Sequence, residues 1–234
     1  DDRIGEVLDA LDRLKLTDRT LVIFSSDNGP ARAARPTELA LMHDTATGAG
    51  YGIGAARGIT GGRLGYKGAL FEGGIGVPFI ARWPGKIAAG KVDDQSLISA
   101  VDLLPTFCEL AGVKLPPDYR PDGVSQAATL TGTRSPVRDR PLFWKMNSAW
   151  PAQKTRPDHW VSYAVVHDTW KLVANRDLSY VELFKISSDP YEQHDVRPEH
   201  PEAVTELLKK LKNWQQTLPA SPGGNVFSAE RNQE

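Results

Sequence analysis

The sequence lacks several features that mark special classes of protein. It has one cysteine, Cys108, among 234 residues, so a disulfide within the chain is impossible. No apolar run approaches the roughly 20 residues of a membrane-spanning helix. The 28 basic and 29 acidic residues leave a net charge of −1, without the positive excess of a general nucleic-acid binder. A hydrophobic share of 40% and a length of about one to two domains indicate a globular protein.

Familiar catalytic and nucleotide-binding motifs are also missing. The sequence has no H-E-x-x-H, no G-x-S-x-G, no G-x-x-x-x-G-K-[ST] and no cysteine pair for zinc. Residues 50–55 fit G-x-G-x-x-A, a form of the dinucleotide fingerprint, but the residues before them do not have the strand pattern that this motif requires. These absences weigh against the standard zinc-protease, serine-hydrolase, P-loop and dinucleotide-binding classes.

The spacing of apolar residues predicts an α/β protein. Apolar positions recur at helical spacing over residues 4–15, and a second helix is predicted over residues 103–111. Residues 20–24 and 77–83 predict strands, and the continuous apolar run of the first is typical of a strand buried on both faces of a parallel sheet. Helix, short loop and buried strand together favour a sheet flanked by helices.

The pattern changes after about residue 140. Short strand-like runs separated by brief loops predict an antiparallel sheet, and a long amphipathic pattern after them predicts a helix. The strand runs and the helix cover residues 141–145, 160–166, 170–173, 180–184 and 201–218. We therefore expect an α/β part in residues 1–139, an antiparallel subdomain with its helix in residues 140–218, and a loose tail in residues 219–234.

Asp27 and Asn28 form the first candidate site. They follow the predicted strand at its carboxyl end, the edge where open α/β sheets bind ligands. A carboxylate beside an amide carbonyl offers two hard oxygen ligands suited to Ca²⁺ or Mg²⁺. The same residues, followed by Gly29 and Pro30, also suit a simple turn that ends the strand. On these residues alone both interpretations stay open.

The second candidate is the glycine-rich segment 45–71. It has no acidic residue, nine of its 27 residues are glycine, and its cations are Arg57, Arg63 and Lys67. Glycines let the backbone approach a ligand closely and expose N–H groups, and the cations add positive charge, so the segment suits an anion. A cationic surface loop without a ligand would have the same composition.

Several segments, in the order in which they follow one another along the chain, resemble segments of the sulfatase family. This family belongs to the alkaline-phosphatase-like superfamily. Residues 20–30 resemble its metal-binding strand, and residues 65–75, GYKGALFEGGI, look like its second signature. Further matches lie at residues 77–85, 101–106, 183–184 and 188–192. The resemblance covers most of residues 1–218 and implies an alkaline-phosphatase-like sheet, here partial, ahead of the small antiparallel sheet.

The resemblance implies roles for three residues. Asp27 and Asn28 match ligands of a divalent cation, usually Ca²⁺, with Mg²⁺ as the other candidate. Lys67 matches a lysine that contacts the sulfate group and helps the leaving oxygen depart, so it would be both substrate-binding and catalytic. A cation and an ammonium group around a sulfate ester stabilise the charge that builds on the bridging oxygen.

The sequence also departs from the family pattern. Sulfatases use a formylglycine nucleophile made from Cys or Ser in a C/S-x-P-x-R motif; Cys108 does not fit it, and residues 135–138 have the proline one place too early. Gly76 stands where the family usually has arginine, and residues 31–57 form a long insertion. The chain begins at Asp1, without methionine and already in a helical pattern. We therefore expect a carboxyl-terminal half, with the formylglycine upstream.

The expected function is that of a sulfuric ester hydrolase, which cleaves an aryl or carbohydrate sulfate to an alcohol and inorganic sulfate. Two alternatives remain: a phosphate mono- or diester hydrolase, and a non-catalytic domain that binds anionic glycans. The expected partner is a sulfated small molecule or glycan, with no nucleic acid and no transmembrane segment. The family favours a periplasmic, secreted or lysosomal location. The isolated chain should bind metal weakly and lack turnover, because two ligands do not complete a cage.

Overall fold

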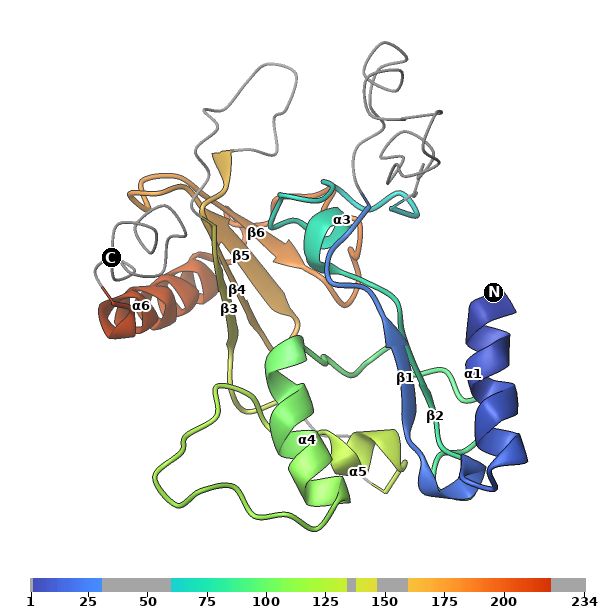
Figure 1. The fold of residues 1–234 in the computed structure, drawn as a ribbon. Coiled ribbons are helices and arrows are strands. Elements are labelled where there is room, and N and C mark those ends of the chain that lie inside the picture. Colours follow the sequence, from blue (N-terminus) through green and yellow to red (C-terminus); the bar gives the residue numbers. More distant parts are fainter. Residues whose placement is uncertain (1, 31–59, 134–137, 147–159, 220–234) are drawn as a thin grey trace, which may run out of the picture.

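The computed structural model describes residues 2–30, 60–133, 138–146 and 160–219. These residues form two antiparallel sheets with helices around them (Figure 1), in agreement with the expected α/β class. The predicted insertion at 31–57 lies outside the described residues, as does the predicted tail from residue 220 onward.

The smaller sheet consists of β1 (Val22–Ser25) and β2 (Phe79–Arg82). Helix α1 (Asp2–Arg13) lies beside it in Figure 1, and the short η1 (Thr17–Arg19) connects this helix to β1. Both strands and the helix form where the sequence predicts them. The sheet therefore places the end of β1, and the residues that follow it, near the centre of the molecule (Figure 1).

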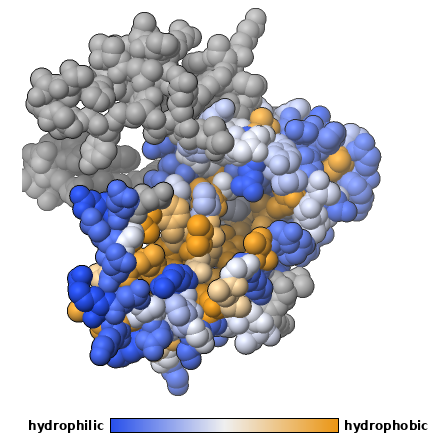
Figure 2. All heavy atoms as spheres, turned by 90° about the vertical axis from the view of Figure 1, so that its right-hand side faces the viewer, coloured by the Kyte–Doolittle hydropathy of each residue, from blue (hydrophilic) through white to orange (hydrophobic). Residues whose placement is uncertain are grey.

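The expected surroundings of β1 are wrong. Its apolar run predicts burial on both faces of a parallel sheet, whereas β1 runs antiparallel to β2 and Phe24 is 48% exposed. Ile80 on β2 is 60% exposed, and Figure 2 shows hydrophobic side chains gathered across this side of the molecule. An apolar run in the sequence shows only that a strand is hydrophobic. The direction in which the strand pairs, and how deeply it is buried, depend on the segments that pack against it. Within the described residues, β1 is paired along one edge only.

The larger sheet is an antiparallel meander in the order β3-β4-β5-β6. Its strands are β3 (Leu142–Lys145), β4 (Tyr163–His167), β5 (Trp170–Ala174) and β6 (Val181–Lys185). Asp168 takes a positive φ of 53° in the two-residue turn between β4 and β5, as tight hairpin turns require. The predicted antiparallel sheet is confirmed.

Helix α6 (Pro201–Thr217) packs on one face of this larger sheet (Figure 1). Leu207 and Leu211 are buried in one cluster with Leu172 and Leu183 of the sheet. Burial of each such side chain contributes about 1.5–3 kcal/mol.

No helix in the described parts of the chain combines the length and apolar character needed to cross a bilayer.

The opposite face of the larger sheet is covered by the residues that follow Lys67. Ala69, Leu70 and Phe71 are at most 3% exposed. They share a core cluster with Val161, Ala164, Val173 and Phe184. Because alternate residues of a strand face opposite sides, β5 contacts both this segment and α6. The glycine-rich segment is thus anchored to the sheet directly after its lysine.

Helix α4 (Leu103–Leu110) follows a buried carboxylate, that of Asp102. Its Oδ2 accepts the N–H of Ser99 at 2.8 Å and pairs with Arg138 Nη1 at 2.7 Å. Its Oδ1 accepts the N–H of Val124 at 2.9 Å. Arg138 is therefore a structural residue that joins this helix region to the chain leading into β3.

Candidate functional site

Asp27 and Asn28 lie in the bend directly after β1, with Asp27 exposed and Asn28 half-buried. Ser26 Oγ donates to the carbonyl oxygen of Asn28 at 2.9 Å. The Asn28 amide nitrogen donates to the carbonyl oxygen of Gly29 at 3.0 Å. This second bond fixes the amide and leaves its oxygen, Oδ1, as the atom available to a cation.

Two backbone hydrogen bonds hold this bend against the glycine-rich segment. The N–H of Gly29 donates to the carbonyl oxygen of Gly74 at 2.8 Å, and the N–H of Lys67 donates to that of Pro30 at 2.9 Å. A Cβ added at Gly29 would lie 1.9 Å from the carbonyl oxygen of Gly73, so only glycine permits this approach. These backbone contacts hold the residue Lys67 close to the bend that contains Asp27 and Asn28, although about 40 residues separate them in the sequence.

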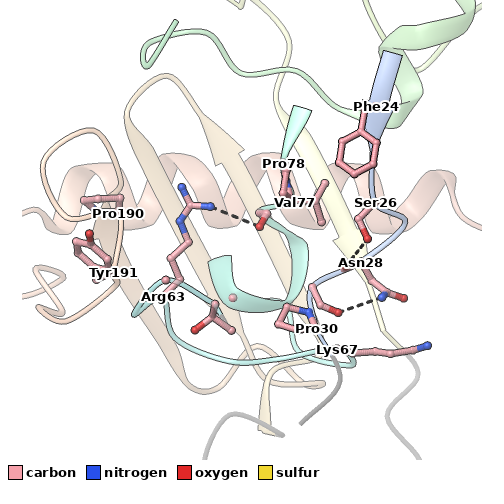
Figure 3. A pocket seen from close by; sticks show the side chains of 15 residues that line it. Phe24, Ser26, Asn28, Pro30, Arg63, Lys67, Val77, Pro78, Pro190 and Tyr191 are labelled. Carbon is pink, nitrogen blue, oxygen red and sulfur yellow. Dashed lines mark hydrogen bonds between the residues drawn. The ribbon is translucent and has the colours of Figure 1, made fainter. Parts of the chain in front are cut away.

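Two neighbouring cavities of about 760 and 700 Å³ adjoin this place. Ser26, Asn28 and Lys67 line both of them, and Asp27 lines the second. Figure 3 shows Lys67 and Asn28 on one side of the first cavity, with Tyr191 on the other. The three residues predicted from the sequence therefore line cavities that share wall residues at the carboxyl end of β1.

Arg63 lies between these two sides of the first cavity (Figure 3). Its Nη1 is 3.5 Å from the carbonyl oxygen of Gly76, and it would be 3.3 Å from a Cβ at that position. The same Cβ would lie 2.8 Å from Glu72 Oε2. The space beside Gly76, where the family usually has arginine, is thus already filled by the Arg63 guanidinium and the Glu72 carboxylate.

Two residues that line the first cavity were not predicted individually as site residues. Arg63 was counted only among the cations of the glycine-rich segment, and Tyr191 only as part of the matching turn at 188–192. Tyr191 is 45% exposed, and its ring would lie 3.3 Å from a Cβ at Gly62. Tyr191 lies beside Gly62, which is far away in the sequence, so the residues around Tyr191 give no sign that it lines this cavity.

The donor atoms of Asp27 and Asn28 suit a hard divalent cation, because a carboxylate and an amide oxygen are ligands that Ca²⁺ and Mg²⁺ prefer. They supply two of the about six to eight oxygens that Ca²⁺ takes. Within residues 2–30, 60–133, 138–146 and 160–219, no group of three or more His, Cys, Asp or Glu side chains could complete such a cage. The described residues thus fit one side of a metal site.

Taken together, the fold and these cavities define an α/β protein in which oxygen-bearing side chains after β1 and a lysine of the glycine-rich segment line the same cavity. Family models agree with this class. The model for Sulfatase matches residues 1–113, and the model for the C-terminal part of N-sulphoglucosamine sulphohydrolase matches residues 63–217. The chain belongs to the sulfatase family.

Curated relatives support the assignment. The chain is 30% identical to N-acetylgalactosamine-6-O-sulfatase of Bacteroides thetaiotaomicron over 90% of its own length and 39% of that protein. It is 30% identical to arylsulfatase K of Xenopus laevis over 99% of its length and 38% of that protein. It is 38% identical to N-acetylgalactosamine-6-sulfatase of Mus musculus over 62% and 24%. The chain therefore spans at most about two fifths of these relatives.

Solved structures show the same fold. A Bacteroides thetaiotaomicron protein, from work on the metabolism of multiple glycosaminoglycans, superposes with a TM-score of 0.65 at 27% identity, over 91% of this chain and 42% of that one. Ps i-CgsB, solved in complex with k-i-k-neocarrahexaose, gives 0.66 at 26% identity, over 90% and 40%. These likenesses confirm a sulfatase fold for most of the chain.

Proposed function

We propose that this chain forms part of a sulfuric ester hydrolase, which cleaves a sulfate ester to an alcohol and inorganic sulfate. The proposal rests on one observation: backbone contacts hold Lys67 beside the Asp27–Asn28 pair, at cavities that both line. An ammonium group that lines the same cavity as oxygens suited to a divalent cation supports this reaction. The names of the curated relatives support the same reaction.

We assign Asp27 and Asn28 to a divalent cation, Ca²⁺ in preference to Mg²⁺. When bound, the cation would supply positive charge against the oxygens of the sulfate group. Asp27 offers carboxylate oxygens, and Asn28 offers Oδ1, which its hydrogen bond to Gly29 leaves available. The formylglycine nucleophile expected for the family would come from residues outside this sequence, which has no C/S-x-P-x-R motif.

Lys67 would bind the sulfate group and assist the leaving oxygen. Its side chain is exposed and lines both cavities, so its ammonium group can approach a substrate in either. As S–O cleavage proceeds, negative charge builds on the bridging oxygen. An ammonium group at that oxygen stabilises this charge and can donate a proton to it.

A sulfated carbohydrate suits the first cavity better than a small aryl sulfate. The cavity, of about 760 Å³, has the cation of Arg63 and the ring of Tyr191 in addition to Lys67. Aromatic rings pack on the apolar faces of sugars, and arginine pairs with sulfate or carboxylate groups. One relative is named for a sulfated amino sugar, and a structural neighbour was solved with a neocarrahexaose.

We further propose that the chain divides near residue 139, into an α/β part and an antiparallel subdomain of residues 140–218. Among the described residues, all strands of the larger sheet follow this point, and α6 packs on that sheet. The family resemblance also favours a periplasmic, secreted or lysosomal location for the protein.

The test is turnover of an aryl sulfate by the intact protein with Lys67 replaced by alanine. We expect kcat to fall about 10²- to 10⁴-fold, the usual contribution of a positioned proton donor. Lys86→Ala, an exposed lysine that lines neither cavity, is the matched control and should retain full turnover. Full turnover by the Lys67→Ala variant would refute the assigned role.

The same assay separates the alternative functions. An aryl phosphate is compared with the aryl sulfate, and each is also measured with added Ca²⁺. Faster cleavage of the phosphate would assign the protein to the phosphate ester hydrolases. Failure of the intact protein to cleave either ester, while it still binds a sulfated glycan, would assign it to the non-catalytic domains.

A further inference from the structure

Lys171 on β5 is fully buried, with 0% of its surface exposed. Lysine is almost never buried to this extent unless it is paired. Its Nζ lies 2.8 Å from Glu72 Oε1 and 2.8 Å from Glu192 Oε1. We call these three residues the Lys171 ion cluster. They come from three separate parts of the chain: a strand, the start of α3 (Glu72–Ile75), and the turn ahead of α6.

Glu192 binds both partners of the cluster. Its Oε2 accepts the backbone N–H of Glu72 at 2.6 Å, while its Oε1 faces the Lys171 ammonium group. Burial raises the pKa of the Glu192 carboxyl, and the ion pair with Lys171 opposes that rise. The residue also has a positive φ of 56°, a conformation that is strained for a glutamate. The turn thus holds an unfavourable backbone state that brings this carboxylate to the start of α3.

The cluster connects to the candidate site through the backbone. Glu72 lines the second cavity together with Lys67 and Asn28. The two glycines that follow it make the contacts of the site: Gly74 accepts from Gly29, and the N–H of Gly73 donates to the carbonyl oxygen of Leu64 at 2.6 Å. A shift of Glu72 would therefore move the glycines against which the Asp27–Asn28 bend is held.

Stability alone does not explain the cluster. On the same side of the sheet, the residues of the core around Phe71 are apolar, among them Ala164, Val173 and Phe184. Replacing a buried ion cluster by well-packed apolar groups is often neutral or stabilising. A chain that needed only to cover this face would use an apolar residue at position 171. The ionic groups add direction instead, because the hydrogen bonds from Lys171 to Glu72 and from the Glu72 N–H to Glu192 each require a particular geometry.

We propose that Lys171 is a positioning residue: together with Glu192 it fixes Glu72, and thereby the start of α3, so that Lys67 stays beside the Asp27–Asn28 pair. This inference rests on the proposed function for the identity of the groups that are positioned. Lys171 lines neither cavity; Glu72 is the member of the cluster that lines the second one, and Lys171 acts through that residue.

The experiment compares Lys171→Met with Leu172→Ala in the intact protein. Leu172 is the next residue on β5, equally buried, but it packs on the α6 side of the sheet. Loss of its side chain destabilises the sheet without touching Glu72. Two quantities are measured: the exchange rates of the backbone amides of residues 72–74, and kcat and KM for an aryl sulfate.

For Lys171→Met we expect exchange of these amides to become at least about tenfold faster, because the start of α3 opens locally. We expect kcat to fall about 100-fold, the usual cost of moving a catalytic group by 1 Å. Leu172→Ala should leave both the local exchange and the kcat of the folded enzyme within about twofold of wild type. Equal effects of the two variants, or no effect of Lys171→Met, would overturn the proposal.

A second variant keeps the proposal testable if Lys171→Met does not fold. Glu192→Gln has nearly the same volume and retains an acceptor for the Glu72 N–H, but it removes the charge that faces Lys171. It should raise exchange at residues 72–74 above that of wild type and of Leu172→Ala, and unchanged exchange at these residues would overturn the proposal. The exchange measurement does not depend on the reaction. Absence of aryl sulfate turnover by the intact wild-type protein, together with altered exchange in Lys171→Met, would therefore refute the proposed function and leave the positioning intact.

Discussion

Replacing Gly29 by alanine probes the contact that forms the candidate site. The added Cβ would lie 1.9 Å from the carbonyl oxygen of Gly73, 2.9 Å from its carbonyl carbon and 3.0 Å from the Cα of Gly74. All three atoms belong to the backbone, so no side chain can rotate away. An ordinary contact needs about 3.4 Å or more, so the two loops must separate by about 1.5 Å.

The expected loss of stability has two parts. Overpacking of this kind costs about 1–3 kcal/mol. Separation also breaks the hydrogen bond from Gly29 to Gly74, which is worth about 1 kcal/mol. The free energy of unfolding should therefore fall by about 2–4 kcal/mol. Because the same movement separates Lys67 from the Asp27–Asn28 pair, kcat/KM should fall by about 100-fold or more.

Urea unfolding, followed by tryptophan fluorescence, measures the first effect, and aryl sulfate turnover by the intact protein measures the second. Gly5→Ala is the matched control, since Gly5 lies within α1 and a Cβ there would have nothing within 4 Å. That substitution should stabilise the protein by about 0.5–1 kcal/mol and leave turnover unchanged. If Gly29→Ala changed stability by less than about 0.5 kcal/mol and kept full turnover, the close approach of the loops would be refuted.

Two further predictions concern buried carboxylates. Asp102→Ala leaves the Arg138 guanidinium buried and unpaired and should lower the free energy of unfolding by about 3–5 kcal/mol in urea titrations. The exposed Asp94→Ala should change it by less than about 0.5 kcal/mol, and an equal effect of the two would contradict the structure. Because the pKa of Glu192 is raised above its ordinary 4.5, the folded state binds more protons than the unfolded state above that pH, and its contribution to stability falls as pH rises. The unfolding free energy of wild type minus that of Glu192→Gln should therefore decrease as pH rises above 4.5, and an increase would show that the ion pair with Lys171 outweighs burial.

The sequence by itself determined the local elements. The helices over residues 103–111 and 201–218 and the strands of the larger sheet form within a few residues of their predicted ranges, because apolar periodicity and short turns act on neighbouring residues. It also determined which residues to consider for the site, since Asp27, Asn28 and Lys67 stand in recognisable short patterns. Each of these signals lies within a short stretch of chain.

The tertiary structure alone decided how these pieces meet. The antiparallel pairing of β1, the approach of Gly29 to Gly73, and the place of Arg63 beside Gly76 each depend on residues far apart in the sequence. The presence of a glycine in the sequence does not show whether another segment of backbone approaches it. Similarly, the sequence shows Lys171 only as a charged residue within a predicted strand. The fold buries it between two carboxylates. Local patterns indicate whether a residue favours an apolar or a polar environment. Only the packing of the folded chain determines which other residues provide that environment.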